Sequence, residues 1–236
     1  MMKTLCVAVV VLSLTSVCQP APLVCEKLLK PVDKASDISG SWYFIAMTSN
    51  TCLVTTLLNY VSWPSVSLKI TSKNTPNVYE SNYILKMYGY CDTASEEFLL
   101  ENNKIFYDIN NTRVAEPDVL LQSGCSDCLV VKGEENIDSL LLFSRRQNVS
   151  AAELKEFEKQ AECLGWAKPE VLNTDHDMEN CLSLDTDDND DSELLSLIFQ
   201  RLGKEYAVPL KCLSESIQKY HKAVCEWVQQ QWATLW

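Results

Sequence analysis

Short stretches of alternating apolar and polar side chains dominate the chain between residues 40 and 147, where helical periodicity is nearly absent. Residues 66–70, 78–87 and 104–109 each place their apolar side chains mainly on one face. Further apolar runs, bounded by turn signals rich in Asn, Gly, Asp and Pro, follow at 119–121, 129–131 and 140–143. Frequent short strands with regular turns predict an antiparallel β-sandwich or β-barrel.

A helical period replaces the alternation after residue 149. Ser150 and Glu153 have the spacing of a capping box, and apolar residues follow three or four positions apart at Leu154, Phe157, Ala161 and Leu164. This pattern predicts one amphipathic helix whose apolar face lies against the sheet. Gly165 and Pro169 provide its end.

The C-terminal part has a different character. Residues 185–193 form an acidic block that predicts a solvated linker, and residues 193–202 are a helix candidate. A longer helix is predicted beyond it, because apolar residues recur at helical spacing from Leu210 to Trp227.

The N-terminus has the features of a secretory signal peptide. Lys3 supplies the positive charge, residues 5–14 supply the apolar core, and Ser16 and Cys18 are small residues suited to cleavage before Gln19. The apolar run is far shorter than the roughly 20 residues that a transmembrane helix requires. We therefore expect a secreted protein, in which the sequons at Asn110 and Asn148 are candidate glycosylation sites.

Eleven cysteines suit an oxidising compartment, and nine remain once the signal is removed. An odd number leaves at least one thiol free or paired with another chain. Cys125 and Cys128 lie between two apolar strand segments, which favours a hairpin disulfide over a redox motif, although either residue could instead pair with Cys52. Cys212 and Cys225 cannot bridge each other within one straight helix, because 13 residues span about 20 Å and a disulfide needs Cα atoms within about 7 Å.

Charge and composition exclude several functions. A net charge of −12 argues against binding to nucleic acid or to anionic membrane surfaces, and it mildly favours cationic or neutral ligands. The same charge keeps a secreted protein soluble. The acidic block does not match a calcium-binding EF-hand loop, because Asp190 and Ser196 stand where that loop needs glycine and glutamate. We therefore expect no metal site. We also expect no cofactor. The only histidines, His176 and His221, accompany no serine or cysteine motif, so we expect no enzyme.

Three sites along the β-region form a recognisable set. Gly40 and Trp42 open the first strand, Asp127 lies in the predicted hairpin, and Arg145 follows the last strand. An arginine there could place its guanidinium over the indole ring of Trp42, an interaction worth about 0.5–2 kcal/mol.

In this order the three sites resemble the motifs of the lipocalin family, with Cys128 replacing the usual tyrosine of the second motif. The similarity covers residues 22–184 and is greatest to the branch of apolipoprotein M and acid glycoprotein (orosomucoid), which includes fish saxitoxin/tetrodotoxin- and tributyltin-binding proteins. The resemblance implies a mainly β fold, an eight-stranded antiparallel up-and-down barrel with one flanking α-helix. It also implies that Cys25 pairs with Cys163 and Cys91 with Cys181, each disulfide being worth about 4–5 kcal/mol in the entropic model.

Together, the residue patterns and the resemblance divide the chain into a signal peptide at 1–18, a lipocalin barrel domain at 19–184, an acidic linker at 185–193 and a helical C-terminal extension at 194–236, which matches no known family. The resemblance implies a secreted carrier that binds a small hydrophobic or amphipathic molecule in the barrel cavity. Trp42 would then lie at the sealed end. Strand parity predicts the following ligand-contacting residues: Phe44, Ala46, Tyr83, Leu85, Met87, Phe98, Tyr107, Leu141 and Phe143.

The C-terminal extension leaves a second function open. Trp227, Trp232 and Trp236 lie within ten residues, so this helix could dock a partner protein or lie on a lipoprotein or membrane surface. The barrel would then be the scaffold and the helix the active element.

Overall fold

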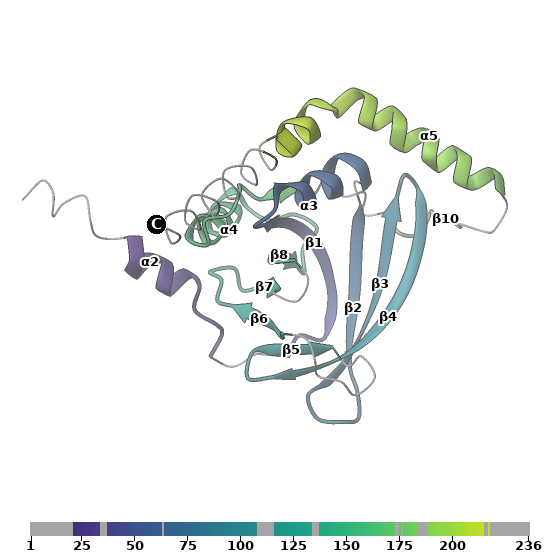
Figure 1. The fold of residues 1–236 in the computed structure, drawn as a ribbon. Helices are drawn as coiled ribbons and strands as arrows, with labels where there is room; N and C mark the ends of the chain where they lie inside the picture. Colours follow the sequence, from purple (N-terminus) through teal and green to yellow (C-terminus); the bar gives the residue numbers. More distant parts are fainter. Residues whose placement is uncertain are drawn as a thin grey trace, which may run out of the picture.

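A closed antiparallel β-barrel forms the centre of the computed structural model, which describes residues 21–33, 37–62, 64–107, 116–133, 137–172, 175, 177–183, 188–214 and 217 (Figure 1). Each barrel strand pairs with the next along the chain, and the last pairs with the first. The predicted eight-stranded up-and-down barrel is thereby confirmed. Its strands are β1 (Gly40–Ser49), β2 (Ser65–Ser72), β3 (Val78–Met87), β4 (Tyr90–Glu101), β5 (Lys104–Tyr107), β6 (Asp118–Leu121), β7 (Cys128–Gly133) and β8 (Ser139–Ser144).

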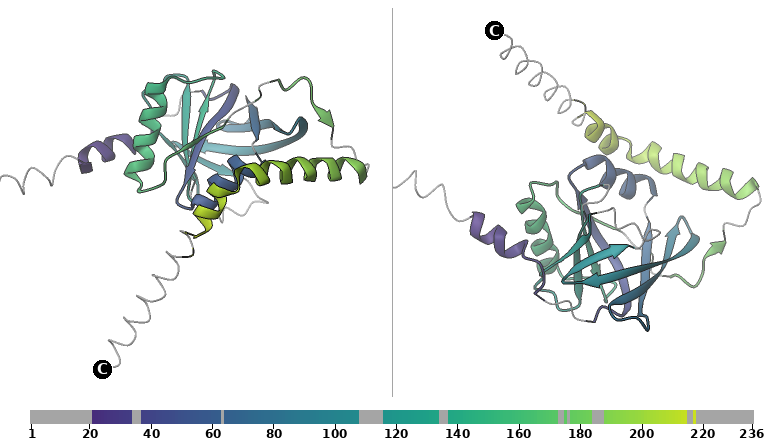
Figure 2. Two further views of the ribbon diagram at one scale, coloured as in Figure 1. Left: turned by 90° about the horizontal axis from the view of Figure 1, so that it is seen from above. Right: turned by 60° about the horizontal axis from the view of Figure 1, so that its bottom comes forward.

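The predicted amphipathic helix is α4 (Ala151–Cys163), which covers the outside of the barrel. Ser150 and Glu153 form the capping box reciprocally, so two backbone N–H groups at the helix start are satisfied. Phe157, only 1% exposed, packs into a cluster with outward-facing strand residues such as Leu121 and Leu142. A shorter helix, α2 (Ala21–Leu28), lies beside α4 in both views of Figure 2.

β1 contains a β-bulge that changes which side chains enter the barrel. Phe44 lies opposite Phe143 and Ala46 opposite Leu142, so one extra residue of β1 separates two consecutive pairs. Because neighbouring strand residues point to opposite faces, the extra residue reverses the alternation. Ala46 is fully buried in the cluster under α4, and Met47 takes the next interior position. The prediction that Ala46 shares the inner face with Phe44 is wrong.

The segment that connects β1 to β2 folds into α3 (Cys52–Leu57) and the π-helical turns of η1 (Leu58–Ser62). Figure 1 shows this α3–η1 cap across the end of the barrel where β1 ends and β2 begins. This cap is not among the elements predicted from the sequence.

After α4 the chain returns to the barrel twice before a C-terminal helix. β9 (Glu170–Val171) pairs with the second half of β1, and β10 (Leu182–Ser183) runs parallel to the start of β4. Helix α5 (Asp188–Glu205) then passes the cap and is followed by helical turns at 207–214. The prediction of a linker over 185–193 is wrong from Asp188 onward, since acidic residues in a first helical turn are favoured by the helix dipole.

Four disulfides join these elements. The two that the resemblance implied are present, and Cys125 pairs with Cys128 as the hairpin context favoured. The fourth joins two residues whose partners were open in the sequence analysis, Cys52 and Cys212. Cys225 and the C-terminal tryptophans lie outside the described residues. Within the described ranges, no helix combines the length and apolarity needed to cross a bilayer.

Candidate functional site

One end of the barrel is sealed around Trp42, which is 3% exposed. The Arg145 guanidinium carbon lies 4.1 Å from the centre of the indole ring, and the same guanidinium donates a hydrogen bond to the Ser39 carbonyl at 2.8 Å. The indole N–H donates to the Ile38 carbonyl at 2.8 Å. Trp42 therefore has its polar atom and one ring face occupied by protein.

Gly40 is required at this end for two reasons. Its φ of +113° is a conformation that residues with a side chain rarely adopt. A Cβ at this position would also collide with the Arg145 guanidinium. The first and third motif sites are therefore in direct contact.

Asp127 fixes the neighbouring hairpin between β6 and β7. Its backbone carbonyl accepts a hydrogen bond from the Arg145 N–H at 2.9 Å, and its carboxylate pairs with Arg146 Nε at 3.2 Å. Arg146 also reaches Glu153 at 2.7 Å, which ties the hairpin to the start of α4. Sequence reasoning identified Asp127 and Arg145 but missed the bridging role of Arg146.

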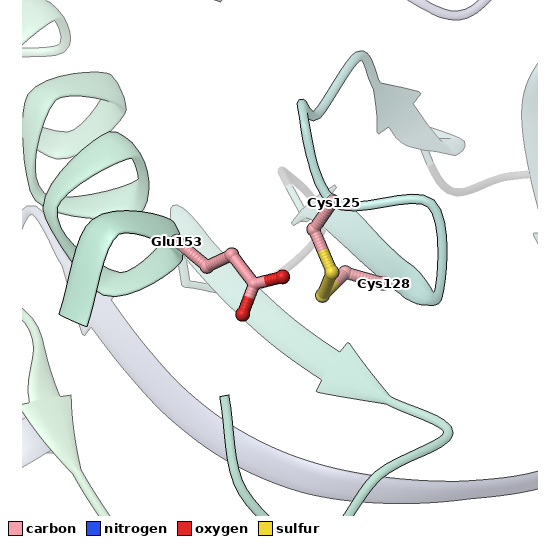
Figure 3. A group of neighbouring side chains, drawn as sticks. All are labelled: Cys125, Cys128 and Glu153. Atoms are coloured by element: carbon pink, nitrogen blue, oxygen red, sulfur yellow. A yellow bond between two sulfur atoms is a disulfide. The ribbon is translucent and has the colours of Figure 1, made fainter. Parts of the chain in front are cut away.

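Cys125, Cys128 and Glu153 lie together beside this hairpin (Figure 3), with one candidate ligand atom from each within 4.8 Å of the others. The two sulfurs are joined in a disulfide and offer no thiolate to a metal. Hydrogen bonds from Ser150, followed by the contact with Arg146, hold the pKa of the Glu153 carboxyl below its ordinary value. This group of side chains therefore secures the hairpin and the helix cap.

Aromatic side chains fill much of the barrel interior. Phe44 stacks on Phe143 at 5.1 Å between ring centroids, and both pack with Leu141 towards the α3–η1 cap. Nearer the sealed end, Phe98 lies 5.6 Å from Tyr79 and 6.3 Å from Tyr107. The structure thus brings five of the predicted residues into two interior clusters: Phe44, Phe98, Tyr107, Leu141 and Phe143.

The other three predicted residues line β3. Tyr83 pairs with Leu68 and Leu85 with Val66, and both partners belong to the interior clusters. Directly paired strand residues share a face, so Tyr83, Leu85 and, two positions on, Met87 face the interior. All three are half-buried.

Two carboxylates that the sequence analysis missed lie on the same inner face. Asp92 pairs with Leu85, and Glu96 occupies the position two residues before the interior side chain of Phe98. Counting back by twos from Phe98 along β4 would have found both. Both carboxylates are exposed, so the inner face of β4 is acidic and open to solvent in its first half.

The α3–η1 cap is held in place from several directions. Leu58 packs on the interior cluster of Phe44 and Met47. The Tyr88 hydroxyl donates to the Val61 carbonyl, and the Asn59 amide donates to the Glu170 carboxylate at 3.0 Å. Burial raises the pKa of the Tyr88 phenol, which therefore stays protonated as a donor.

Helix α5 and the turns after it add two further restraints to the cap. Arg201 donates to the Asn59 carbonyl at 3.1 Å, and Cys212, 5% exposed, forms the disulfide with Cys52. The C-terminal extension is therefore attached to the barrel at the cap. The barrel interior thus carries clustered aromatic side chains and lies between the sealed end and the cap.

The barrel, its single flanking helix and the contact between Trp42 and Arg145 resemble the lipocalins. A solved siderocalin, Ex-FABP, described as functioning through dual ligand specificities, superposes with a TM-score of 0.50 at 19% identity, over 64% of this chain and all of that one. This likeness establishes the fold.

Two curated relatives are the saxitoxin and tetrodotoxin-binding proteins 1 and 2 of Takifugu pardalis. Each is 28% identical over 184 residues, which covers 69% of this chain and 45% of the relative. The chain thus spans less than half of the length of the relatives it matches. No family model matches the chain.

Proposed function

We propose that the protein is a secreted carrier that binds a small hydrophobic or amphipathic molecule inside the barrel, and that it has no catalytic step. The observation that carries this proposal is the inner face between the sealed end and the cap, which Phe44, Phe143 and Tyr83 line. The relatives' names, which describe binding of saxitoxin and tetrodotoxin, support a small-molecule ligand.

The binding energy would come mainly from removing apolar ligand surface from water, at roughly 25 cal/mol per Å². Tyr83 would orient a polar group of the ligand, whereas the Tyr107 hydroxyl already donates a hydrogen bond to the Asp118 carboxylate at 3.3 Å. The carboxylates of Asp92 and Glu96 favour a ligand that also carries a positive charge, and the net charge of −12 attracts the same class of molecule.

Secretion is supported by the four disulfides, which persist in oxidising compartments. The predicted signal peptide at 1–18 and the sequon at Asn110 lie outside the described residues. Asn148 is exposed, so its sequon remains a candidate for glycosylation.

Native mass spectrometry of the protein secreted from eukaryotic cells tests the carrier function. We expect a co-purified small molecule, or uptake of an added hydrophobic amine at one molecule per barrel. The variant Leu85→Glu places a further carboxylate on the inner face and should change the amount of amine that the protein takes up. The control variant Ile84→Glu places the carboxylate on the outer face and should leave this amount unchanged. Recovery of only empty protein, with no uptake of lipids or amines, would contradict the proposal.

The C-terminal extension supports a second candidate function, in which its helix docks a protein or lipid surface. Two apolar side chains on α5 are exposed, Leu195 at 51% and Phe199 at 67%. Beyond α5, Leu210 and Ile217 are 56% and 60% exposed. Truncation after Ser183, combined with Cys52→Ser to avoid a free thiol, separates the two functions. Retained small-molecule binding would assign the ligand to the barrel, and its loss would favour the C-terminal extension.

A further inference from the structure

A groove lies on the outside of the barrel between α2, α4 and the loop that follows β6. Its volume is about 860 Å³, within the range of small-molecule sites. α2 contributes Leu23, Val24 and Leu28, and residues 122–124 of the loop form one edge. The groove is separate from the interior that the proposed function uses, because its lining residues belong to α2, to the loop after β6 and to α4, and both helices lie outside the barrel (Figure 2).

The groove combines exposed apolar surface with a local excess of positive charge. Leu23 is 75% and Val24 51% exposed. Lys27, Lys155 and Lys159 line the same groove, in a chain whose net charge is −12. Long aliphatic stems allow lysines to cover an apolar ligand while their ammonium groups meet its charged end.

The three lysines are not neutralised by neighbouring carboxylates. Among the described residues, none of them forms an ion pair within 4 Å. The acidic side chain in the groove is Glu156, whose carboxylate accepts a hydrogen bond from the Gly124 N–H at 2.7 Å. Its charge is thus directed at the loop backbone.

The walls of the groove are fixed before any ligand arrives. The Cys25–Cys163 disulfide joins α2 to α4. Gln160, 1% exposed, donates from its side-chain amide to the carbonyls of Leu28 and Gln122, each at 2.9 Å. A preformed site avoids the entropic cost of ordering its walls on binding.

From this geometry we infer that the groove binds a single anionic amphiphile, a molecule with one hydrocarbon chain and a carboxylate or phosphate headgroup. The chain lies on Leu23, Val24 and Leu28, and the headgroup meets Lys155 and Lys159. The barrel interior has the opposite charge preference, because Asp92 and Glu96 face it. The two sites therefore take ligands of opposite charge.

The test uses sodium oleate, kept below its aggregation concentration, with the full-length secreted protein and isothermal titration calorimetry. The double variant Lys155→Glu/Lys159→Glu changes two exposed side chains and is expected to weaken oleate binding about tenfold or more. The matched control Lys69→Glu/Lys104→Glu makes the same change of charge at exposed barrel positions and is expected to leave the affinity unchanged. Equal weakening by both variants, or by neither, would overturn the inference.

Two further measurements distinguish binding in this groove from binding in the barrel and from binding to a membrane surface. Leu85→Glu, on the inner face of the barrel, should leave oleate binding intact, and loss of oleate in this variant would place the oleate in the barrel and overturn the inference. In a sedimentation assay, the protein should not pellet with vesicles of phosphatidylserine and phosphatidylcholine. Sedimentation that depends on Lys155 and Lys159, without stoichiometric uptake of oleate, would identify a membrane-surface site and reject the groove.

Discussion

The sealed end and the capped end of the barrel are closed by different means. At the sealed end the contacts come from the barrel's own strands and the residues beside them, since Gly40, Trp42 and Arg145 meet where β1 begins and β8 ends. At the capped end the closure comes from inserted and distant segments, α3–η1 and the C-terminal extension, joined by Cys52–Cys212. From this difference we expect the sealed end to contribute mainly to the stability of the barrel, and the cap to control access to its interior.

Replacement of Trp42 is expected to have the largest effect. Trp42→Ala removes a buried aromatic ring and its contact with Arg145, which should lower the free energy of unfolding by about 3–5 kcal/mol. Denaturant unfolding with the disulfides intact measures the change. Trp166 is half-buried at the edge of the cluster between α4 and the barrel, so Trp166→Ala should lower the free energy of unfolding by clearly less. Equal losses of stability in the two variants would mean that the sealed end has no special role.

Breaking the link at the other end should change access more than stability. Cys52→Ser combined with Cys212→Ser frees the cap from the C-terminal extension, and we expect a loss of only about 2 kcal/mol because the other disulfides still restrain the unfolded chain. A bound ligand should dissociate faster, as stopped-flow fluorescence would show. Cys125→Ser/Cys128→Ser is the control at the sealed end, and an unchanged dissociation rate in the first variant would show that the cap does not govern access.

The chemistry of the barrel interior can be tested with the two inner carboxylates. Asp92→Asn/Glu96→Gln should weaken binding of a hydrophobic amine by about threefold to tenfold and leave its neutral amide analogue unaffected. Glu97→Gln/Glu101→Gln changes the opposite face of the same strand and should have little effect. If the amine binds the inner-face variant as tightly as the native protein, the ligand does not need a positive charge.

The smallest expected effect is the pH dependence of the sealed end. The pKa of Glu153 is held below its ordinary value of 4.5 by hydrogen bonds from Ser150 and by Arg146. Its contribution to stability is therefore present above pH 4.5 and is lost as the pH falls through the lowered pKa. Glu153→Gln should reduce the loss of stability over this acidic range, measured by thermal unfolding at a series of pH values. A parallel pH profile in both proteins would show that the carboxylate is not coupled to folding.

The same contrast explains how far the sequence could predict the structure. The sealed end was predictable, because Gly40, Trp42 and Arg145 have fixed positions relative to the first and last strands. The cap was not, because the pairing of Cys52 with Cys212 spans 160 residues and no local pattern specifies it. The bulge in β1 was equally hidden, so Ala46 was placed on the wrong face while Phe44 was placed correctly.

The order in which the chain is synthesised gives the disulfide at the cap a further consequence. The last barrel strand ends at Ser144, whereas the cysteine that fixes the cap is residue 212. Chains emerge from the ribosome at about 5–20 residues per second, so a complete set of barrel strands precedes that cysteine by several seconds. During this interval the cap is not yet covalently held to the C-terminal extension, so the proposed carrier would meet its ligand with an open barrel before Cys52 pairs with Cys212.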